Sequence, residues 1–337
     1  MPPSAETGIA TEGEPTKTPT ARRHQASLLE RFAGPGFLAV MFVVFTVMLP
    51  DTFPTYNNLI AVVNNQTITA MVALGLLVPL AAGVFDISIG GILTLSVIFS
   101  TLMFQTTGGD MPVPVVILLT LGIGILAGLF NAILVVRLRI EPFIVTLGSG
   151  SVFIGISQLI AGGKVISEHI PSGFTDLGRS EPLGIPAPII YVLALAALLG
   201  YVFVMTPLGR KIYATGANRD AARLAGVPTD RILYLAFMTS GVCAAAAGLL
   251  YAMRIGAGQP EVGGQYLLPA YAAAFLGSTM IKPGRFNVLG LLVGLLIIAV
   301  GINGLQLNGI PSWVIPTFQG AALILAVVLT KVRGRRH

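Results

Sequence analysis

Charged residues are scarce in this chain of 337 residues. They make up 10% of the sequence, whereas a soluble domain contains roughly 25%. Hydrophobic residues make up 54%, and they form repeated apolar runs of about 18 residues or more, which is the length that a helix needs to cross a bilayer. The composition therefore predicts an all-α membrane protein with several spans.

The sequence also lacks the patterns of metal sites and of catalytic centres. Cys243 is the single cysteine and lies within an apolar run, which excludes a disulfide within the chain and a cysteine-based metal site. The histidines at positions 24, 169 and 337 show no metal-ligand spacing, and no candidate nucleophile lies beside them. We therefore expect no metal, no cofactor and no catalytic residue. A net charge of +6 is more typical of loops beside anionic lipid than of nucleic-acid binding.

No nucleotide-binding loop is present. The pattern G-x-x-x-x-G-K-[S/T] is absent, and the nearest match, Gly162-Gly163-Lys164-Val165, fails it. The chain is therefore not expected to hydrolyse ATP.

Only Asp86, of fourteen acidic residues, lies deep within apolar sequence. A proton relay needs several intramembrane titratable groups, so a cation-coupled carrier is disfavoured, and no acid–base pair supports a membrane enzyme.

The apolar runs predict ten spans. An even number places both termini on one side of the membrane, and only Lys164, Arg179 and Arg254, of 20 basic residues, then fall on the other side. The positive-inside rule therefore predicts cytoplasmic termini. Residues 1–30, which lack an apolar period, are expected to form a disordered cytoplasmic tail, and residues 31–337 a single transmembrane domain. The predicted spans are 33–50, 59–80, 88–104, 113–135, 143–161, 187–205, 232–253, 265–281, 286–303 and 313–331.

The polar segment 206–231 is the most elaborate surface outside the apolar runs. Within it, residues 218–226 predict a short amphipathic helix, with Asn218 or Asp220 as N-cap and Gly226 as the stop. This makes the segment a candidate interaction site, and the alternative is a solvated loop near lipid headgroups. Its five basic residues are Arg210, Lys211, Arg219, Arg223 and Arg231.

Polar residues within the apolar runs are further candidates. The second and third predicted spans are separated by a break in the helix. The break is indicated by the polar residues Asp86 and Ser88 and by nearby glycines, which include Gly90. Asp86 has either a role in gating or a structural role, in which Asp86 or Ser88 caps the third span. Asn131 and Asn303 either line a polar path or form hydrogen bonds between helices.

Three motifs resemble the permease subunits of bacterial ABC importers of the ribose/monosaccharide class, over residues 55 to 333. The sequence Asp86-Ile-Ser-Ile-Gly90 is similar to the family's G-G-x-D-L-S-V-G motif, and Arg137 to Gly148, with Pro142, is similar to its R-L-x-x-P-F-I-V-T-L-G segment. Residues 208–226 resemble its L-G-R…G-x-N-x-x-A-A-R-x-x-G loop, which here contains Ala221 and Ala222. The sequence departs from the family at Val84, where the first motif has a glycine, and at the turn 278–286.

The resemblance implies a permease fold of the ribose/vitamin-B12-type architecture in the bacterial cytoplasmic membrane. It also implies that residues 206–231 carry a coupling helix that docks on a separate ABC ATPase subunit, with Arg219 and Arg223 available to acidic groups of that partner. The other implied partners are an extracytoplasmic sugar-binding protein, a second permease copy or a sister permease, and membrane lipid. A permease of a related nucleoside or branched-chain amino-acid importer remains the alternative.

Overall fold

The computed structural model of the chain describes residues 28–311 and 313–334, and this part of the chain is helical. The only strand-like pairing in it is an isolated bridge between Ile166 and Gly258. The tail predicted for residues 1–30 lies outside the described residues, except that the first helix begins at Leu28. The helices are α1 Leu28–Met48, α2 Tyr56–Asn65, α3 Thr67–Ala81, α4 Ile89–Thr106, α5 Val113–Val136, α6 Pro142–Ala161, α7 Ser172–Arg179, the short 3-10 helix η1 Pro182–Gly184, α8 Ala187–Met205, α9 Pro207–Ala217, α10 Arg219–Leu224, α11 Thr229–Ile255, α12 Gly264–Ser278, α13 Val288–Leu307 and α14 Val314–Gly334.

Six of the described helices are long and apolar enough to cross a membrane: α4, α5, α6, α8, α11 and α13. The pair α2 and α3 also meets this test when taken together, with a bend of 43° between the two helices. Shorter apolar stretches, Phe32–Met48 and Val314–Val328, lie in α1 and α14. These helices identify a multi-pass membrane protein.

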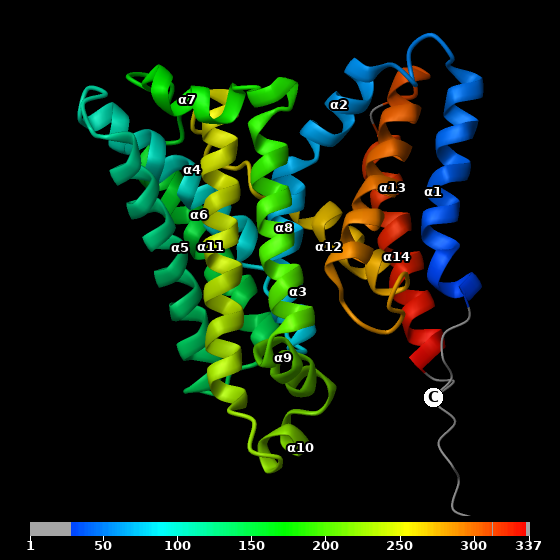
Figure 1. Ribbon diagram of the computed structural model, residues 1–337. Coiled ribbons are helices and arrows are strands. Elements are labelled where there is room, and N and C mark those ends of the chain that lie inside the picture. The colour runs from blue at the N-terminus through cyan, green and yellow to red at the C-terminus, as the bar shows by residue number, and fades with distance from the viewer. Residues whose placement is uncertain (1–27, 312, 335–337) are drawn as a thin grey trace, which may run out of the picture.

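Helix α3 forms the centre of the molecule. All 15 of its residues are buried, and α8, α11 and α12 pack around it. The helix is apolar on every side, with no periodic polar face, as expected of a helix enclosed by other helices. In Figure 1, α1, α13 and α14 form a group on one side of the molecule, and α4, α5, α6 and α11 form a group on the other.

Glycines allow α5 and α11 to pack with their backbones in close contact. A Cβ added at Gly124 would lie 2.4 Å from the carbonyl oxygen of Gly241, and one added at Gly128 would lie 2.3 Å from that of Phe237. A similar contact joins α12 to α13, where a Cβ on Gly290 would lie 2.2 Å from the carbonyl oxygen of Gly277. Because lipid supplies no hydrophobic force between helices, small residues at such contacts contribute to association through close packing.

The two ends of the bundle differ. Helix α7 lies at one end, and α9 and α10 lie at the opposite end (Figure 1). Helix α1 begins, and α14 ends, on the side of the molecule where α10 lies (Figure 1). The long polar connection between α6 and α8, which contains α7, is therefore separated from residues 206–231 by the length of the bundle.

Candidate functional site

The first half of the polar segment 206–231 is a helix, α9, where sequence analysis expected only a loop. Pro207 occupies the first turn, and the hydroxyl of Thr206 accepts a hydrogen bond from the amide of Gly209 at 3.4 Å, a typical helix start. The phenol of Tyr213 donates to the carbonyl of Phe286 at 2.5 Å. Burial raises the pKa of Tyr213, so the phenol keeps its proton and this contact ties α9 to the connection between α12 and α13. Arg210 is exposed on α9.

The second half contains the predicted short helix, α10. The side chain of Asn218 accepts a hydrogen bond from the amide of Ala221 at 2.9 Å, so Asn218, rather than Asp220, is the N-cap. Gly226 follows the helix with φ of +82°, a left-handed conformation that favours glycine. The amide of Val227 then donates to the carbonyl of Ala222 at 2.9 Å, which turns the chain back towards α11.

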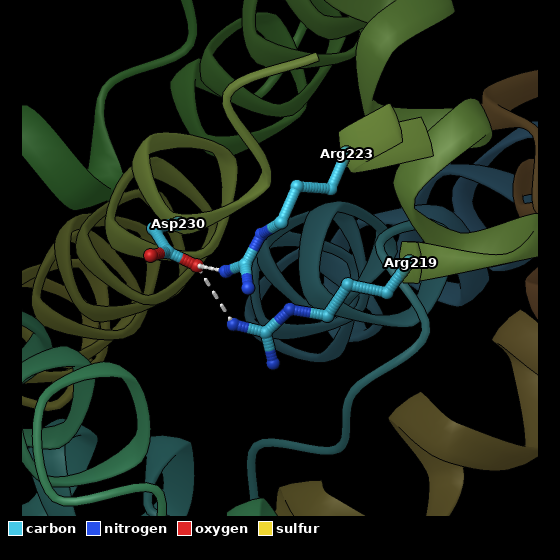
Figure 2. A network of polar contacts seen from close by, with 3 residues as sticks. All are labelled: Arg219, Arg223 and Asp230. Atoms are coloured by element: carbon cyan, nitrogen blue, oxygen red, sulfur yellow. Dashed lines mark hydrogen bonds and ion pairs between the residues drawn. The ribbon is translucent and has the colours of Figure 1, made fainter. Parts of the chain in front are cut away.

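Two arginines of α10 bind the same carboxylate. Nη2 of Arg219 and Nη2 of Arg223 lie 3.0 and 2.6 Å from Oδ1 of Asp230, in the first turn of α11 (Figure 2). We call these three residues the arginine clamp. The family resemblance implied acidic groups of a partner for both arginines, whereas within the chain they meet Asp230, one of the two acids in residues 206–231. The clamp joins α10 to the first turn of α11.

Helix α10 has a packed face and an outward face. Ala222 is buried, with 6% of its surface exposed, whereas Leu224 is 91% exposed. Ala221 is also exposed. A helix that enters a partner's groove does so through exposed apolar side chains, and Leu224 is the large apolar side chain of α10 that is exposed. Ala222 therefore contributes to packing within the chain, and Ala221 and Leu224 are the residues of this helix that a partner can reach.

Asp86 lies in the connection between α3 and α4 and is fully buried. Its Oδ1 accepts hydrogen bonds from the amide of Ser88 at 3.1 Å and from the hydroxyl of Ser88 at 2.5 Å. The hydroxyl of Tyr271 bonds to both the amide and the carbonyl of Asp86, at 3.1 and 2.9 Å. Ser88 is the N-cap residue of α4 but forms no side-chain cap; its hydroxyl donates to Asp86 and accepts from the side chain of Asn131 instead.

Asn131 and Asn303 form hydrogen bonds between helices. Asn131 is fully buried and donates to the hydroxyl of Ser88 at 2.7 Å, which joins α5 to the start of α4. Asn303 exchanges two amide hydrogen bonds with Asn58, at 3.1 and 3.0 Å, and so joins α13 to α2. Of the two roles left open by the sequence, these contacts support bonding between helices.

Gly90 and Pro142 occupy structural positions. A Cβ added at Gly90 would lie 3.3 Å from the carbonyl oxygen of Gly263, so glycine allows α4 to approach the start of α12. Pro142 is the first residue of α6, and the preceding Glu141 caps that helix by accepting from the amide of Ile144 at 3.0 Å. Both glycine and proline are common at such positions.

A polar hollow of about 620 Å³ lies at the C-terminal end of α6. Gln158 and Glu261 both line it, and the amide of Gln158 donates a hydrogen bond to the carboxylate of Glu261. Neither Asn131 nor Asn303 lines it. The part of the chain that the structure describes contains no group of three or more His, Cys, Asp or Glu side chains arranged to hold a metal ion. The sequence signal for the hollow was weak, since its residues come from two distant segments.

Comparison with known proteins finds related permeases. The family model described as branched-chain amino acid transport system / permease component matches residues 58–327. The ribose import permease protein of Haemophilus influenzae is 30% identical over 303 residues, 89% of this chain and 92% of the relative. That of Bacillus subtilis is 31% identical over 322 residues, 95% and 99% of the two chains. The autoinducer 2 import system permease protein of Yersinia enterocolitica is 33% identical over 272 residues, 79% and 81% of the two chains. No solved structure matches the chain.

Proposed function

This chain belongs to the family of branched-chain amino acid transport system permease components, and we propose that it is the transmembrane subunit of an ATP-binding-cassette importer for a monosaccharide or a related polyol. In this proposal the chain forms the translocation path, and a separate ATPase subunit hydrolyses ATP. An extracytoplasmic sugar-binding protein delivers the substrate, and a second copy or a sister permease completes the path.

The arrangement of α10 carries the proposal. The helix lies at one end of the bundle (Figure 1), the arginine clamp holds it against α11, and Leu224 is almost fully exposed. A rigid helix with an exposed apolar residue suits the groove of a partner protein. We infer that Ala221 and Leu224 enter the ATPase subunit, and that the clamp keeps α10 oriented so that movement of the ATPase reaches α11.

Residues 206–231 are then the cytoplasmic coupling loop of a single permease domain that spans residues 31–337. We propose ten spans with both termini in the cytoplasm of a bacterium and a ribose/vitamin-B12-type architecture. A described helix coincides with each of the ten predicted spans, when α2 and α3 count together. The start of α1 and the end of α14 lie towards the end of the bundle that carries α10 (Figure 1), which supports this topology.

The relatives support a sugar as the substrate. Two of those reported above are ribose import permeases, and one of them matches 95% of this chain. The description of the family model favours a second candidate, a branched-chain amino acid. Both candidates assign the same role to α10, so they differ in substrate alone.

Uptake of labelled ribose and labelled leucine by cells with and without this chain tests the proposal. We expect the chain to increase ribose uptake. Depletion of ATP should abolish that increase, whereas a protonophore that leaves the ATP concentration intact should not reduce it. Uptake of leucine in place of ribose would support the second candidate. Uptake that follows the proton or sodium gradient would contradict an ATP-driven importer.

A further inference from the structure

We propose that the polar hollow at the C-terminal end of α6 is the site where an uncharged, hydroxyl-rich substrate enters the permease. The inference rests on the proposed function, because it names the part of the chain that first binds the imported molecule. Gly163 and Val165, which line the hollow, belong to the connection that contains α7. Helix α7 and helix α10 lie at opposite ends of the bundle (Figure 1), so the hollow is separate from the coupling helix.

One wall of the hollow is the non-helical segment 256–263, which joins α11 to α12. Near its start, Gly258 exchanges two backbone hydrogen bonds with Ile166, at 3.0 and 2.7 Å. At its end, the amide of Gly263 donates to the hydroxyl of Thr94 in α4 at 2.9 Å. The segment therefore runs from the connection that contains α7 to the first half of α4.

This segment reaches into the depth of the bundle. Figure 1 shows that α12, which follows it, begins between the two ends of the bundle. Non-helical backbone at such a depth is stable only where protein encloses it or where it lines a water-filled cavity, because lipid offers its amides and carbonyls no partner. Gln259 and Glu261 of the segment are exposed, and a carboxylate is far more stable in water than in hydrocarbon. The hollow is therefore filled with water.

The side chains of the hollow suit a ligand with many hydroxyl groups. Its polar residues carry three amides and one carboxylate, namely Gln158, Gln259, Gln265 and Glu261. An amide both donates and accepts hydrogen bonds and a carboxylate accepts them, which matches the two roles of a hydroxyl group. The volume of about 620 Å³ lies within the range of roughly 300–1,000 Å³ that small-molecule sites have.

Two of these side chains are already held in place. The amide of Gln158 donates to the carboxylate of Glu261, which joins α6 to the segment 256–263. The phenol of Tyr251 donates to Oε1 of Gln259 at 2.8 Å, so the amide nitrogen of Gln259 is the group that remains to donate to a ligand. Polar groups that are oriented before binding lose less conformational entropy when the ligand arrives.

The charge of the hollow disfavours an amino acid. Among the described residues, its lining contains Glu261 and no basic side chain. The carboxylate of leucine would lie close to Glu261 without a cation to balance it, and like charges brought together weaken binding. The apolar lining is limited to Val165, Pro260 and Val262, of which Val262 is buried. An uncharged polyhydroxyl compound meets neither obstacle.

Protection of a cysteine against chemical labelling tests the site directly. Val165→Cys, in a Cys243→Ala background, places a thiol on the lining at a position that is 57% exposed and contributes no polar group. The rate of its reaction with a water-soluble maleimide is measured on the purified full-length chain in detergent. Ribose and ribitol at millimolar concentrations should slow the reaction severalfold and reach saturation, and leucine should not. Ser172→Cys on α7, outside the hollow, is the control and should react at an unchanged rate.

A second comparison tests the polar side chains. Glu261→Ala removes the carboxylate and should raise the ribose concentration needed for half-maximal protection on the order of tenfold, with a matching loss of ribose uptake in cells. Glu168→Ala is the matched control. Glu168 accepts a hydrogen bond from the amide of Gln105 at 3.4 Å and is exposed in the connection that contains α7, but it does not line the hollow. It should change neither quantity.

The inference is wrong if ribose and ribitol leave the labelling of position 165 unchanged, if they slow positions 165 and 172 equally, or if Glu261→Ala behaves as Glu168→Ala does. Protection by leucine in place of ribose would also overturn it. ATP-driven ribose uptake that Glu261→Ala does not reduce would remove the hollow from the substrate path and leave the proposed function intact. Protection by ribose in a chain whose uptake follows the proton gradient would keep the hollow and overturn the ATP-driven importer.

Discussion

Gly216 in α9 packs directly against Gly83, which follows the end of α3. A Cβ added at Gly83 would lie 3.1 Å from Cα of Gly216, and one added at Gly216 would lie 2.1 Å from the carbonyl oxygen of Ala81. Asp86 follows three residues after Gly83. The proposed coupling loop is therefore in backbone contact with the connection that carries the buried Asp86.

This contact predicts that Gly216→Ala destabilises the protein. The added methyl group would displace backbone on one side or the other, and overpacking of this kind costs about 1–3 kcal/mol of unfolding free energy. Gly200→Ala on α8 is the matched control, since a Cβ there meets nothing within 4 Å. Chemical denaturation should show a loss for the first variant and no loss for the second. Equal stability of both variants would mean that α9 does not pack tightly on α3.

The arginine clamp predicts a local effect of Asp230→Asn. Arg219, Arg223 and Asp230 are each about half exposed, and exposed ion pairs contribute only about 0–1 kcal/mol each. We therefore expect little change in unfolding temperature but faster hydrogen exchange of the α10 amides, together with weaker stimulation of ATP hydrolysis by substrate in the assembled importer.

Asp220→Asn is the control for the clamp, because it removes a carboxylate from α10 itself without touching Asp230. It should leave both the exchange rates and the ATP hydrolysis close to those of the unaltered chain. If Asp220→Asn and Asp230→Asn have equal effects on hydrogen exchange, the order of α10 depends on the net charge of this region and not on the contacts of the clamp.

The amide pair of Asn58 and Asn303 predicts a structural effect of Asn303→Ala. The substitution leaves one amide partly unpaired, which costs about 1 kcal/mol of unfolding free energy, and uptake per folded molecule should not change. Asn57→Ala, at an exposed neighbouring position, should change neither quantity. A stable Asn303→Ala protein that has lost uptake would instead place Asn303 in the substrate path.

The proposed topology predicts that residues 172 and 220 face opposite sides of the membrane. Ser172 and Asp220 are exposed, so cysteines there should react with membrane-impermeant reagents. The background is Cys243→Ala, which removes the buried native thiol. We expect labelling of position 172 in intact cells and of position 220 only after the membrane is opened. Labelling of both positions in intact cells would overturn the ten-span arrangement.

The sequence predicts the helices well, because membrane helices need long apolar runs. The stop at Gly226 was also predicted, since it depends on local backbone chemistry, whereas the sequence left the N-cap open between Asn218 and Asp220 and the structure shows Asn218. The bend between α2 and α3 was missed because the apolar run continues through it with only a short polar interruption at residues 64–66.

The site itself could be predicted only in part. Ala221 and Ala222 are identical in type, yet one is exposed and the other buried, which depends on how α10 packs on its neighbours. The pairing of Arg219 and Arg223 with Asp230 joins α10 to α11, and the hydrogen bond from Asn131 to Ser88 joins α5 to the start of α4. Such contacts have no local signal in a single sequence.

The measurement that most directly tests the account is co-purification of the tagged chain from its native membrane, followed by mass spectrometry of the proteins retained. The unaltered chain should retain a P-loop ATPase, and Leu224→Asp should lose it while keeping the same unfolding temperature. Leu183→Asp is the control, since Leu183 is 99% exposed in the connection on the other side of the bundle, and it should retain the ATPase. A chain that purifies without an ATPase, or a Leu224→Asp variant that retains it, would contradict the proposed role of α10.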